Sequence, residues 1–170
     1  ARLVDAPLPF RGDFVGYRRY VGATPVWLGA AARVPDVDIL RDLVSAGADP
    51  NLAADDRTTP LMAAIGMVQN EARLAPESES LAVVRLLVEL GVDVNATSRD
   101  GQTAMHGAAR LARNSVISVL VEHGGQVNTA DARGRTPLDV GTVSRPLQPD
   151  TAELLKSLGG YSGLERSNQR

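Results

Sequence analysis

The segment Gly101-Gln-Thr-Ala-Met-His-Gly-Ala-Ala109 decides the fold, because the chain carries the same pattern four times. The other copies read Gly22-Ala-Thr-Pro-Val-Trp-Leu28, Thr58-Thr-Pro-Leu-Met-Ala-Ala64 and Gly134-Arg-Thr-Pro-Leu-Asp139. Their aligned threonines, Thr24, Thr59, Thr103 and Thr136, are separated by steps of 35, 44 and 33 residues. Self-similarity at such a period indicates a repeated unit whose copies stack on one another.

Each copy has the residues that begin a helix. The threonine hydroxyl can cap the free backbone N–H groups at the helix start. Pro25, Pro60 and Pro137 follow at the first helical position, where a missing N–H costs nothing and the fixed φ helps. The small residues after them, such as Ala63-Ala64 and Ala108-Ala109, let neighbouring helices approach closely. The pattern therefore predicts a short inner helix in each of the four repeats.

A second, outer helix follows in the first three repeats, with apolar residues at helical spacing. These stripes are expected to fill the layer between the helices, and they contain Ile39, Leu40, Leu43 and Val44; Val83, Val84, Leu86, Leu87 and Leu90; and Val116, Ile117, Val119, Leu120 and Val121. Gly47, Gly91 and Gly124 then supply a left-handed helix end. Asn51, Asn95 and Asn128 follow, each eight residues before the next threonine, and are expected to bond backbone in the turn.

This pattern resembles the ankyrin repeat over about residues 20–160. The resemblance implies an all-α ankyrin-repeat solenoid of helix-turn-helix units with short β-hairpin fingers. More narrowly, the phrases Val21-Gly-Ala-Thr-Pro-Val-Trp-Leu28, Thr58-Thr-Pro-Leu-Met-Ala-Ala64 and Thr103-Ala-Met-His-Gly-Ala-Ala109 are similar to ankyrin proteins of soil bacteria. The sequence departs from the family where its usual histidine is replaced by Trp27, Met62 and Asp139, so that only His106 keeps it.

The repeats are assigned to residues 22–54, 55–98, 99–131 and 132–160, the last as a C-terminal cap. Repeat two carries an acidic insert at about 69–80, and residues 161–170 are expected to form a flexible tail. Residues 1–21 fit no full repeat. They are interpreted as the end of a preceding repeat or as a dedicated cap, and the first is favoured because no polar outer helix precedes repeat one.

Bulk composition and motifs argue against several function classes. The net charge is −2, so no broad positive field points to nucleic acid. No apolar run reaches about 18 residues, so membrane insertion is not expected. With no cysteine and two separated histidines, neither a catalytic site, a metal site nor a cofactor is predicted. Cytoplasmic, periplasmic and secreted locations all stay open, the last two if a signal peptide was removed.

The two histidines and the tryptophan are assigned mainly structural roles. His106 is expected to hydrogen-bond the turn at the start of an inner helix, and His123 to sit at an exposed helix end. Trp27, the only tryptophan, is either a binding anchor or a packing residue, and packing is favoured.

The resemblance implies a non-enzymatic module that binds a partner protein through the concave groove of the stack. Carrying the family's variable positions onto this chain gives candidate groove residues of mixed charge: Tyr20, Asp55, Asp56, Thr58, Met67, Arg99, Asp100, Gln102, Arg110, Leu111, Arg133 and Arg135. Met67 is expected on the inner helix of repeat two. The alternative is a structural or accessory subunit held permanently in a larger assembly. It would use an apolar N-terminal face around Phe14, Tyr17, Tyr20 and Trp27.

Overall fold

The inner helices of the first two repeats begin where their threonines predict. In a computed structural model of the protein, α1 spans Pro25–Ala30 and α3 spans Pro60–Ile65. The hydroxyl of Thr24 accepts the Trp27 N–H, and that of Thr59 accepts the Met62 N–H. Both prolines lie at the first helical positions, so the predicted helix starts are confirmed for these two repeats.

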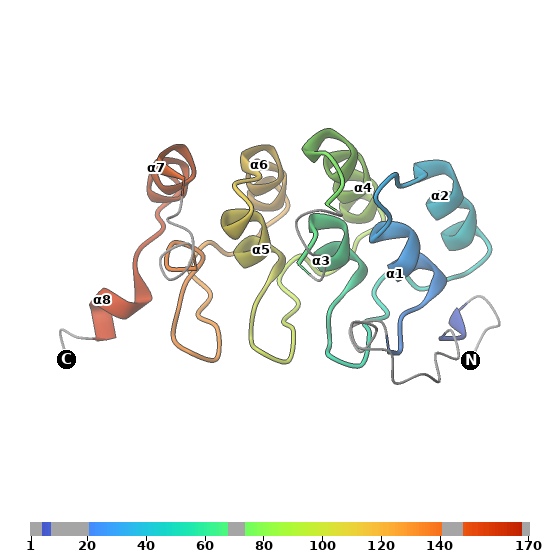
Figure 1. Ribbon diagram of the computed structural model, residues 1–170, viewed down its shortest axis with the longest axis horizontal. Helices are drawn as coiled ribbons and strands as arrows, with labels where there is room; N and C mark the ends of the chain where they lie inside the picture. Colours follow the sequence, from blue (N-terminus) through green and yellow to red (C-terminus); the bar gives the residue numbers. More distant parts are fainter. Residues whose placement is uncertain (1–4, 8–20, 68–73, 141–147, 168–170) are drawn as a thin grey trace. The chain divides into compact units, whose positions relative to one another are not determined.

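The structure describes residues 5–7, 21–67, 74–140 and 148–167, with side chains up to 165, and these fall into two units. The first unit is Ala1–Asp93 and the second is Val94–Arg170. In the first unit, α1 packs against α2 (Val37–Ser45) and α3, and α4 (Glu77–Glu89) packs against both α2 and α3 (Figure 1). In the second unit, α5 (Ala104–Arg110) packs against α6 (Asn114–Glu122).

Helix α4 is longer than the other outer helices because it absorbs part of the expected insert. It has 13 residues, whereas α2 and α6 have nine each. Glu77–Ser80 form its first turn, and the buried Ser80 hydroxyl donates to the Ala64 carbonyl at 2.7 Å. The insert expected at 69–80 is therefore partly regular helix, while 68–73 lie outside the described residues.

Repeat four differs from the expected pattern at its start. Residues 137–140 form a turn, so Pro137 does not begin a helix within the described residues. The outer helix of this repeat, α7, spans Pro149–Ser157. It buries Leu155 and exposes Glu153, Lys156 and Ser157. The assignment of this repeat as a C-terminal cap stays a prediction. The expected tail at 161–170 contains a five-residue helix, α8 (Gly163–Ser167), and its flexibility stays a prediction.

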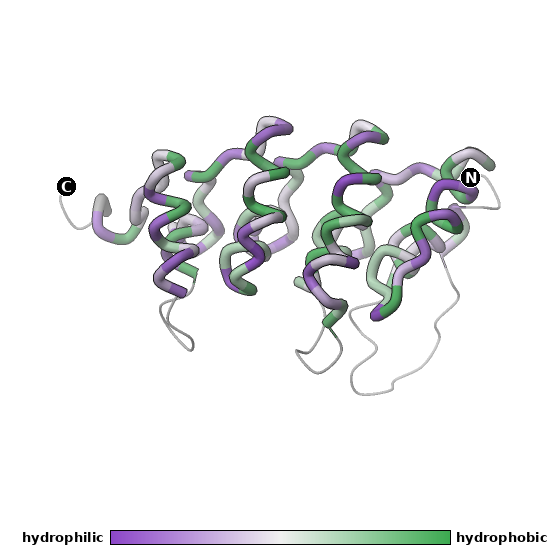
Figure 2. The backbone as a smooth tube through the Cα atoms, turned by 90° about the horizontal axis from the view of Figure 1, so that it is seen from above, coloured by the Kyte–Doolittle hydropathy of each residue, from purple (hydrophilic) through white to green (hydrophobic). Residues whose placement is uncertain are grey.

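The outer helices bury their apolar stripes to different extents. In α4 the side chains of Val83, Val84, Leu86 and Leu87 are at most 2% exposed, and in α6 Val116, Ile117, Val119 and Leu120 are at most 1% exposed. Hydrophobic and hydrophilic residues both occur along the helices (Figure 2). In α2 only Leu40 is buried, while Ile39 is 56% exposed. The expectation that Ile39 fills the layer between helices is wrong.

Trp27 is a core residue of the first unit. Its side chain is fully buried and clusters with Ala23, Ala54 and Ala63. The indole N–H donates to the Thr58 carbonyl at 2.9 Å, which satisfies the one polar atom of the ring. The interpretation of Trp27 as a packing residue is confirmed, and it does not contribute to an exposed apolar face.

Between the repeats the chain forms tight hairpin turns, which we call the fingers. Each contains a backbone hydrogen bond of the same kind, donated by the N–H of Ala54, Ser98 or Asp131 to the carbonyl of Thr58, Gln102 or Arg135, respectively. No strand is assigned among the described residues, so the expected β-hairpin fingers are turns with hairpin-like pairing. At Gly101 φ is +74°, and a side-chain carbon there would lie 2.9 Å from the Ala132 nitrogen. Glycine thus permits the close approach of two fingers in the second unit.

The asparagines after the helix ends form a ladder from one repeat to the next. The Asn51 side-chain oxygen accepts the Asp93 N–H at 3.1 Å. Asn95 accepts the Gln126 N–H and donates to the Gly124 carbonyl, and Asn128 similarly contacts the Tyr161 N–H and the Gly159 carbonyl. These side chains were expected to bond backbone. They bond the corresponding turn of the following repeat, which ties neighbouring repeats together within each unit.

Candidate functional site

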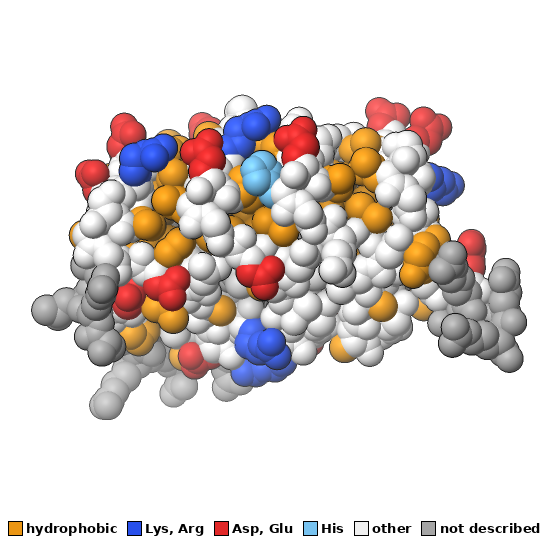
Figure 3. Space-filling model, turned by 180° about the vertical axis from the view of Figure 1, so that it is seen from behind, with side chains coloured by type: hydrophobic (Ala, Val, Ile, Leu, Met, Phe, Trp, Pro, Cys, Tyr) orange, Lys and Arg blue, Asp and Glu red, His pale blue; other side chains and the backbone are white. Residues whose placement is uncertain are grey.

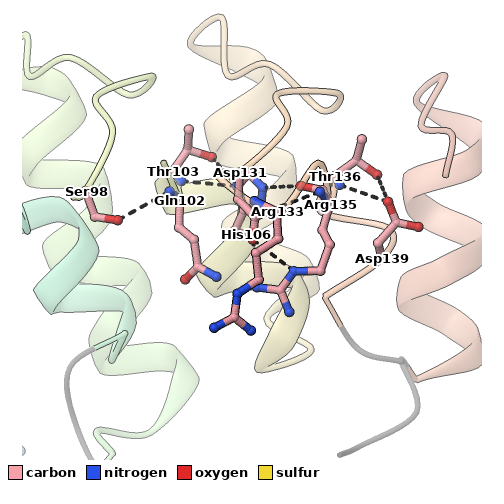
Figure 4. A network of polar contacts seen from close by, with 9 residues as sticks. All are labelled: Ser98, Gln102, Thr103, His106, Asp131, Arg133, Arg135, Thr136 and Asp139. Carbon is pink, nitrogen blue, oxygen red and sulfur yellow. Dashed lines mark hydrogen bonds and ion pairs between the residues drawn. The ribbon is translucent and has the colours of Figure 1, made fainter. Parts of the chain in front are cut away.

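The last finger of the second unit is organised around one buried carboxylate (Figure 4). Asp131 accepts the backbone N–H groups of Arg133 and Arg135 at 2.9 and 3.0 Å. It also accepts the Arg135 guanidinium through two bonds of 2.7 and 3.0 Å, and its side chain is only 2% exposed. Burial alone would raise the pKa of Asp131, but these hydrogen bonds together lower it below its ordinary value. Asp131 therefore acts as the internal anchor of the finger.

His106 joins this finger to the start of α5. The Thr103 N–H donates to its Nδ1 at 3.1 Å, and its Nε2 lies 3.1 Å from the Arg135 carbonyl oxygen. Since a carbonyl can only accept, Nε2 must carry the proton, which leaves Nδ1 as the acceptor in a neutral ring. Burial lowers the pKa of His106, in agreement with this neutral form. The expected turn-bonding role of His106 is confirmed.

Asp139 takes over the histidine position in repeat four. One of its carboxylate oxygens, Oδ2, accepts the N–H groups of Thr136 and Gly163 at 2.9 and 2.8 Å. Burial would raise the pKa of Asp139, but hydrogen bonds from Ser162, Thr136 and Gly163 lower it overall. The Thr136 hydroxyl donates to the Tyr161 carbonyl at 2.6 Å. The chain after α7 is thus fastened to the last finger.

The candidate residues of the first unit separate into exposed and buried positions. Asp55 is exposed at the first finger and Asp56 is half-buried, with its carboxylate accepting the Thr58 N–H at 2.9 Å. Thr58 itself is only 4% exposed, so its side chain is not available to a partner. Met67 was expected on the inner helix but lies beyond it, because α3 ends at Ile65 with Gly66 in the left-handed region. Tyr20 lies outside the described residues.

The second unit brings most of its candidates together at the fingers. Arg99, Asp100 and Arg133 are exposed, and Gln102 and Arg135 are half-buried. The Ala132 N–H donates to the Asp100 carbonyl at 2.9 Å, which joins the two fingers of this unit. In Figure 4 the side chains of Gln102, Arg133 and Arg135 extend to the same side of the finger backbone.

The two candidates on α5 lie at its C-terminal end. Arg110 is its last residue and is exposed, whereas Leu111 caps the helix and is half-buried. On the face drawn in Figure 3, acidic, basic and apolar side chains are interspersed, and neither sign of charge covers it.

The described part of the chain contains no group of three or more His, Asp or Glu side chains placed to hold a metal ion. None of its helices combines the length and the hydropathy needed to cross a membrane.

The arrangement of capped helix pairs, fingers and asparagine bonds agrees with the family comparison. A family model described as ankyrin repeats in three copies matches residues 72–162. The chain belongs to the ankyrin-repeat family. Ankyrin repeats generally mediate protein–protein interaction, and ankyrin-repeat proteins are typically non-enzymatic interaction modules.

Three similar proteins illustrate the match. Neurogenic locus notch homolog protein 1 of Danio rerio is 39% identical over 94 residues, which is 53% of this chain and 4% of that protein. Alpha-latroinsectotoxin-Lt1a of Latrodectus tredecimguttatus is 30% identical over 143 residues, 84% of this chain and 9% of the toxin. SH3 and multiple ankyrin repeat domains protein 1 of Homo sapiens is 35% identical over 103 residues, which is 59% of this chain and 4% of that protein.

This ankyrin-repeat chain therefore spans less than a tenth of the length of these relatives. All three come from animals, so the narrower resemblance to bacterial ankyrin proteins stays a prediction.

Sequence reasoning missed the roles of Asp131 and Asp139. Asp139 carried a signal, because it stands where His106 stands in the preceding repeat. Asp131 carried a weaker signal in the sequence, because Arg135 follows it by four residues in a tight turn and can pair with it.

Proposed function

We propose that this ankyrin-repeat chain is a non-enzymatic module that binds a partner protein through the groove surface of finger tips and inner-helix ends. The observation that carries the proposal is that the polar residues in and next to the fingers of the second unit separate into a buried and an exposed group. Asp131, His106 and Asp139 are buried, and their side chains form hydrogen bonds with other residues of the repeats. Arg99, Asp100 and Arg133 are exposed beside them.

Side chains of both signs at the tips favour a protein partner over a polyanion. Arg99 and Arg133 extend from the fingers of the second unit together with Asp100, and Asp55 extends from a finger of the first unit. Complementary charges contribute specificity and a faster encounter more than raw affinity. Because the finger backbone is held by internal bonds, a partner would find this surface preformed, with little ordering entropy to overcome.

The test compares binding by three folded proteins: the wild type, a finger variant and a control. The finger variant is Asp55→Arg/Arg99→Glu/Arg133→Glu. The control, Glu89→Arg/Arg85→Glu/Lys156→Glu, makes the same net change in charge at exposed outer-helix positions. Circular dichroism melts check that all three are folded, and affinity capture from a lysate of the source organism identifies proteins retained by the wild type.

A protein captured by the wild type and the control but lost with the finger variant is the expected result. Equal capture by all three would place the binding surface away from the finger tips and contradict the proposal. Loss with both variants would indicate that net charge, and not the finger surface, determines retention.

A further inference from the structure

One turn position holds an arginine where the other repeats hold glycine. Two residues before the aligned threonines, repeats one, three and four have Gly22, Gly101 and Gly134, whereas repeat two has Arg57. The φ angles of the three glycines are +78°, +74° and +75°, and that of Arg57 is +63°. All four residues are therefore in the left-handed region, which is unfavourable for a residue with a side chain. Arg57 has this conformation in spite of its side chain.

The backbone of the first finger imposes the left-handed conformation on Arg57. The Arg57 N–H donates to the Ala54 carbonyl at 2.8 Å, and the Thr58 N–H donates to the Asp56 carboxylate at 2.9 Å. The N–H groups at the same place in the last two fingers donate within their turns in the same way, at 3.0 and 2.9 Å. Arg57 thus adopts a conformation that the turn requires and that glycine would adopt at lower free energy.

The side chain of Arg57 forms no contact with the chain that would compensate for this conformation. It is exposed at the finger tip. Within the described ranges its guanidinium donates no hydrogen bond and forms no ion pair, unlike that of Arg135, which pairs with Asp131 at 2.7 Å. Left-handed residues other than glycine concentrate at sites that bind another molecule. The position of Arg57 therefore points to a contact outside the chain.

The first finger presents Arg57 from a fixed backbone. The Thr58 carbonyl accepts both the Ala54 N–H and the indole N–H of the buried Trp27, each at 2.9 Å. These bonds hold the finger against the core of the first unit, so that little backbone freedom is left to lose on binding. The planar guanidinium can donate two parallel hydrogen bonds to the oxygens of one carboxylate.

Neighbouring carboxylates restrict the anion that Arg57 can bind. Asp55 is exposed and Asp56 is half-buried on the same finger. A phosphate group carries a charge of about −1.5 to −2 at neutral pH, so both aspartates would repel it more strongly than a carboxylate with a single charge. The finger therefore favours the acidic side chain of a protein over a phosphate group.

We propose, on the basis of the partner-binding function above, that Arg57 contacts the partner directly and that its guanidinium pairs with a carboxylate in an acidic segment of that protein. The repeat pattern did not indicate this residue, because it reserves the position for glycine. Arg57 thus adds a specificity-determining residue to the candidate surface of the first unit.

The test begins by obtaining defined acidic peptides as probes. A library of short random peptides displayed on phage is selected on the wild-type chain, and enriched peptides that contain Asp or Glu are synthesised with a fluorescent label. Fluorescence anisotropy then gives their dissociation constants for the wild type, Arg57→Gly, Arg57→Ala and Ala112→Gly. Ala112, with φ of +52°, is the other left-handed residue besides glycine in the described part of the chain, and it provides the matched control.

We expect Arg57→Gly to weaken peptide binding about tenfold or more, because it removes a charge-assisted bidentate contact. The same variant should raise the midpoint of thermal unfolding of the first unit, followed by Trp27 fluorescence, by about 2–4 °C, since glycine relieves the left-handed strain. Arg57→Ala should weaken binding equally without raising the midpoint. Ala112→Gly relieves the same kind of strain and should leave the dissociation constant unchanged.

Single replacements in the peptide identify the carboxylate opposite Arg57. Each Asp is changed to Asn and each Glu to Gln, and each new peptide is measured with the wild type and with Arg57→Gly. One replacement should weaken binding to the wild type about tenfold and have little further effect on Arg57→Gly, because both changes remove the same contact.

Three results would overturn the proposal. The first is equal affinity of the acidic peptides for the wild type and Arg57→Gly, or the absence of any peptide replacement that couples with Arg57. The second is a selection that enriches no acidic peptide, since the finger would then not accept such a segment. The third is a lower unfolding midpoint in Arg57→Gly, because the left-handed arginine would then carry no cost.

None of these results decides whether the chain binds a partner protein. Lysate capture with Asp55→Arg/Arg99→Glu/Arg133→Glu tests that function separately, because this variant keeps Arg57. Capture that is lost with the triple variant but retained with Arg57→Gly would support the finger surface and contradict the role of Arg57.

Discussion

His106 connects two backbone segments through the two nitrogens of one ring. Its Nδ1 accepts the Thr103 N–H at the start of α5, and its Nε2 donates to the Arg135 carbonyl in the last finger. Adding a proton to Nδ1 would remove the acceptor that the Thr103 N–H needs. Neutral imidazole is thus the form that the fold stabilises.

We expect the chain to lose stability as the pH falls from about 7.5 to about 5.5 because of His106. Its pKa is lowered in the folded state by burial, so in the unfolded chain the ring takes up a proton at a higher pH. Where the unfolded state binds more protons, the free energy of unfolding decreases as the pH falls. Urea denaturation at the two pH values measures the loss.

His106→Gln should make stability less sensitive to pH in this range, since glutamine at the same helix position can still accept the Thr103 N–H. His123→Gln, which removes the other histidine at an exposed position of the same unit, is the control. An unchanged pH dependence in His106→Gln would contradict the assignment. The carboxylates of Asp131 and Asp139 affect the pH dependence of stability only at more acidic pH, because their pKa values are lowered from 3.8.

Asp139→Ala should destabilise the second unit by about 1–3 kcal/mol, because it leaves buried N–H groups without an acceptor. The Thr136 and Gly163 N–H groups both bond to the Asp139 carboxylate, and the Asp139 side chain is buried. Thermal melts followed by circular dichroism measure the change. Asp139→Asn keeps an acceptor oxygen and should lower the free energy of unfolding markedly less. Equal decreases in the two variants would mean that packing, and not the hydrogen bonds, is the cause.

At the scale of the elements, the helix pairs depend on bonds that connect one repeat to the next. Asn95 both donates to the Gly124 carbonyl and accepts the Gln126 N–H, at 2.9 and 2.8 Å. The two contacts lie on either side of the turn that ends α6. They hold the turn after α6 against the turn that follows α4 in the preceding repeat.

We expect Asn95→Ala to lower the free energy of unfolding by about 1 kcal/mol, the low end for two hydrogen bonds because both are exposed to water. Hydrogen exchange should accelerate most at the Gln126 amide. Asn95→Asp keeps the acceptor and should leave that amide protected. If the alanine and aspartate variants accelerate exchange equally, the side chain does not act through this bond.

The sequence allowed the helix starts and ends to be predicted because their causes are local. Thr59 and Pro60 act within one turn, and Gly91 ends α4 through its own left-handed conformation. The exposure of Ile39 could not be predicted from its spacing in α2, since the burial of a side chain depends on what covers the helix. The position of Met67 was missed because Gly66 ends α3 earlier than the repeat pattern suggested.

The candidate surface was predictable only as a set of exposed tip positions. Arg99, Asp100 and Arg133 are exposed as the family pattern implies. The burial of Thr58 was not predicted. Its carbonyl accepts a hydrogen bond from the indole N–H of Trp27. That contact joins residues in different repeats, and sequence patterns within one repeat do not show it.

At the scale of the whole molecule, the two units give separate structural signals. Trp27 is the only tryptophan and is buried in the first unit, so its fluorescence reports on Ala1–Asp93. Circular dichroism reports on helices of both units. In repeat proteins, stability is approximately a sum of repeat and nearest-neighbour terms, so unfolding need not be a single transition.

Leu120→Ala should therefore shift the two signals unequally. Leu120 is fully buried in α6 of the second unit, and its truncation should cost about 2–5 kcal/mol. We expect the helical signal to be lost at lower urea concentration, with a smaller shift of the tryptophan transition. Leu61→Ala, at a buried position of α3 in the first unit, is the matched control and should shift the tryptophan transition strongly. If Leu120→Ala shifts both signals equally, the two units unfold as one cooperative body, and the nearest-neighbour description does not hold for this chain.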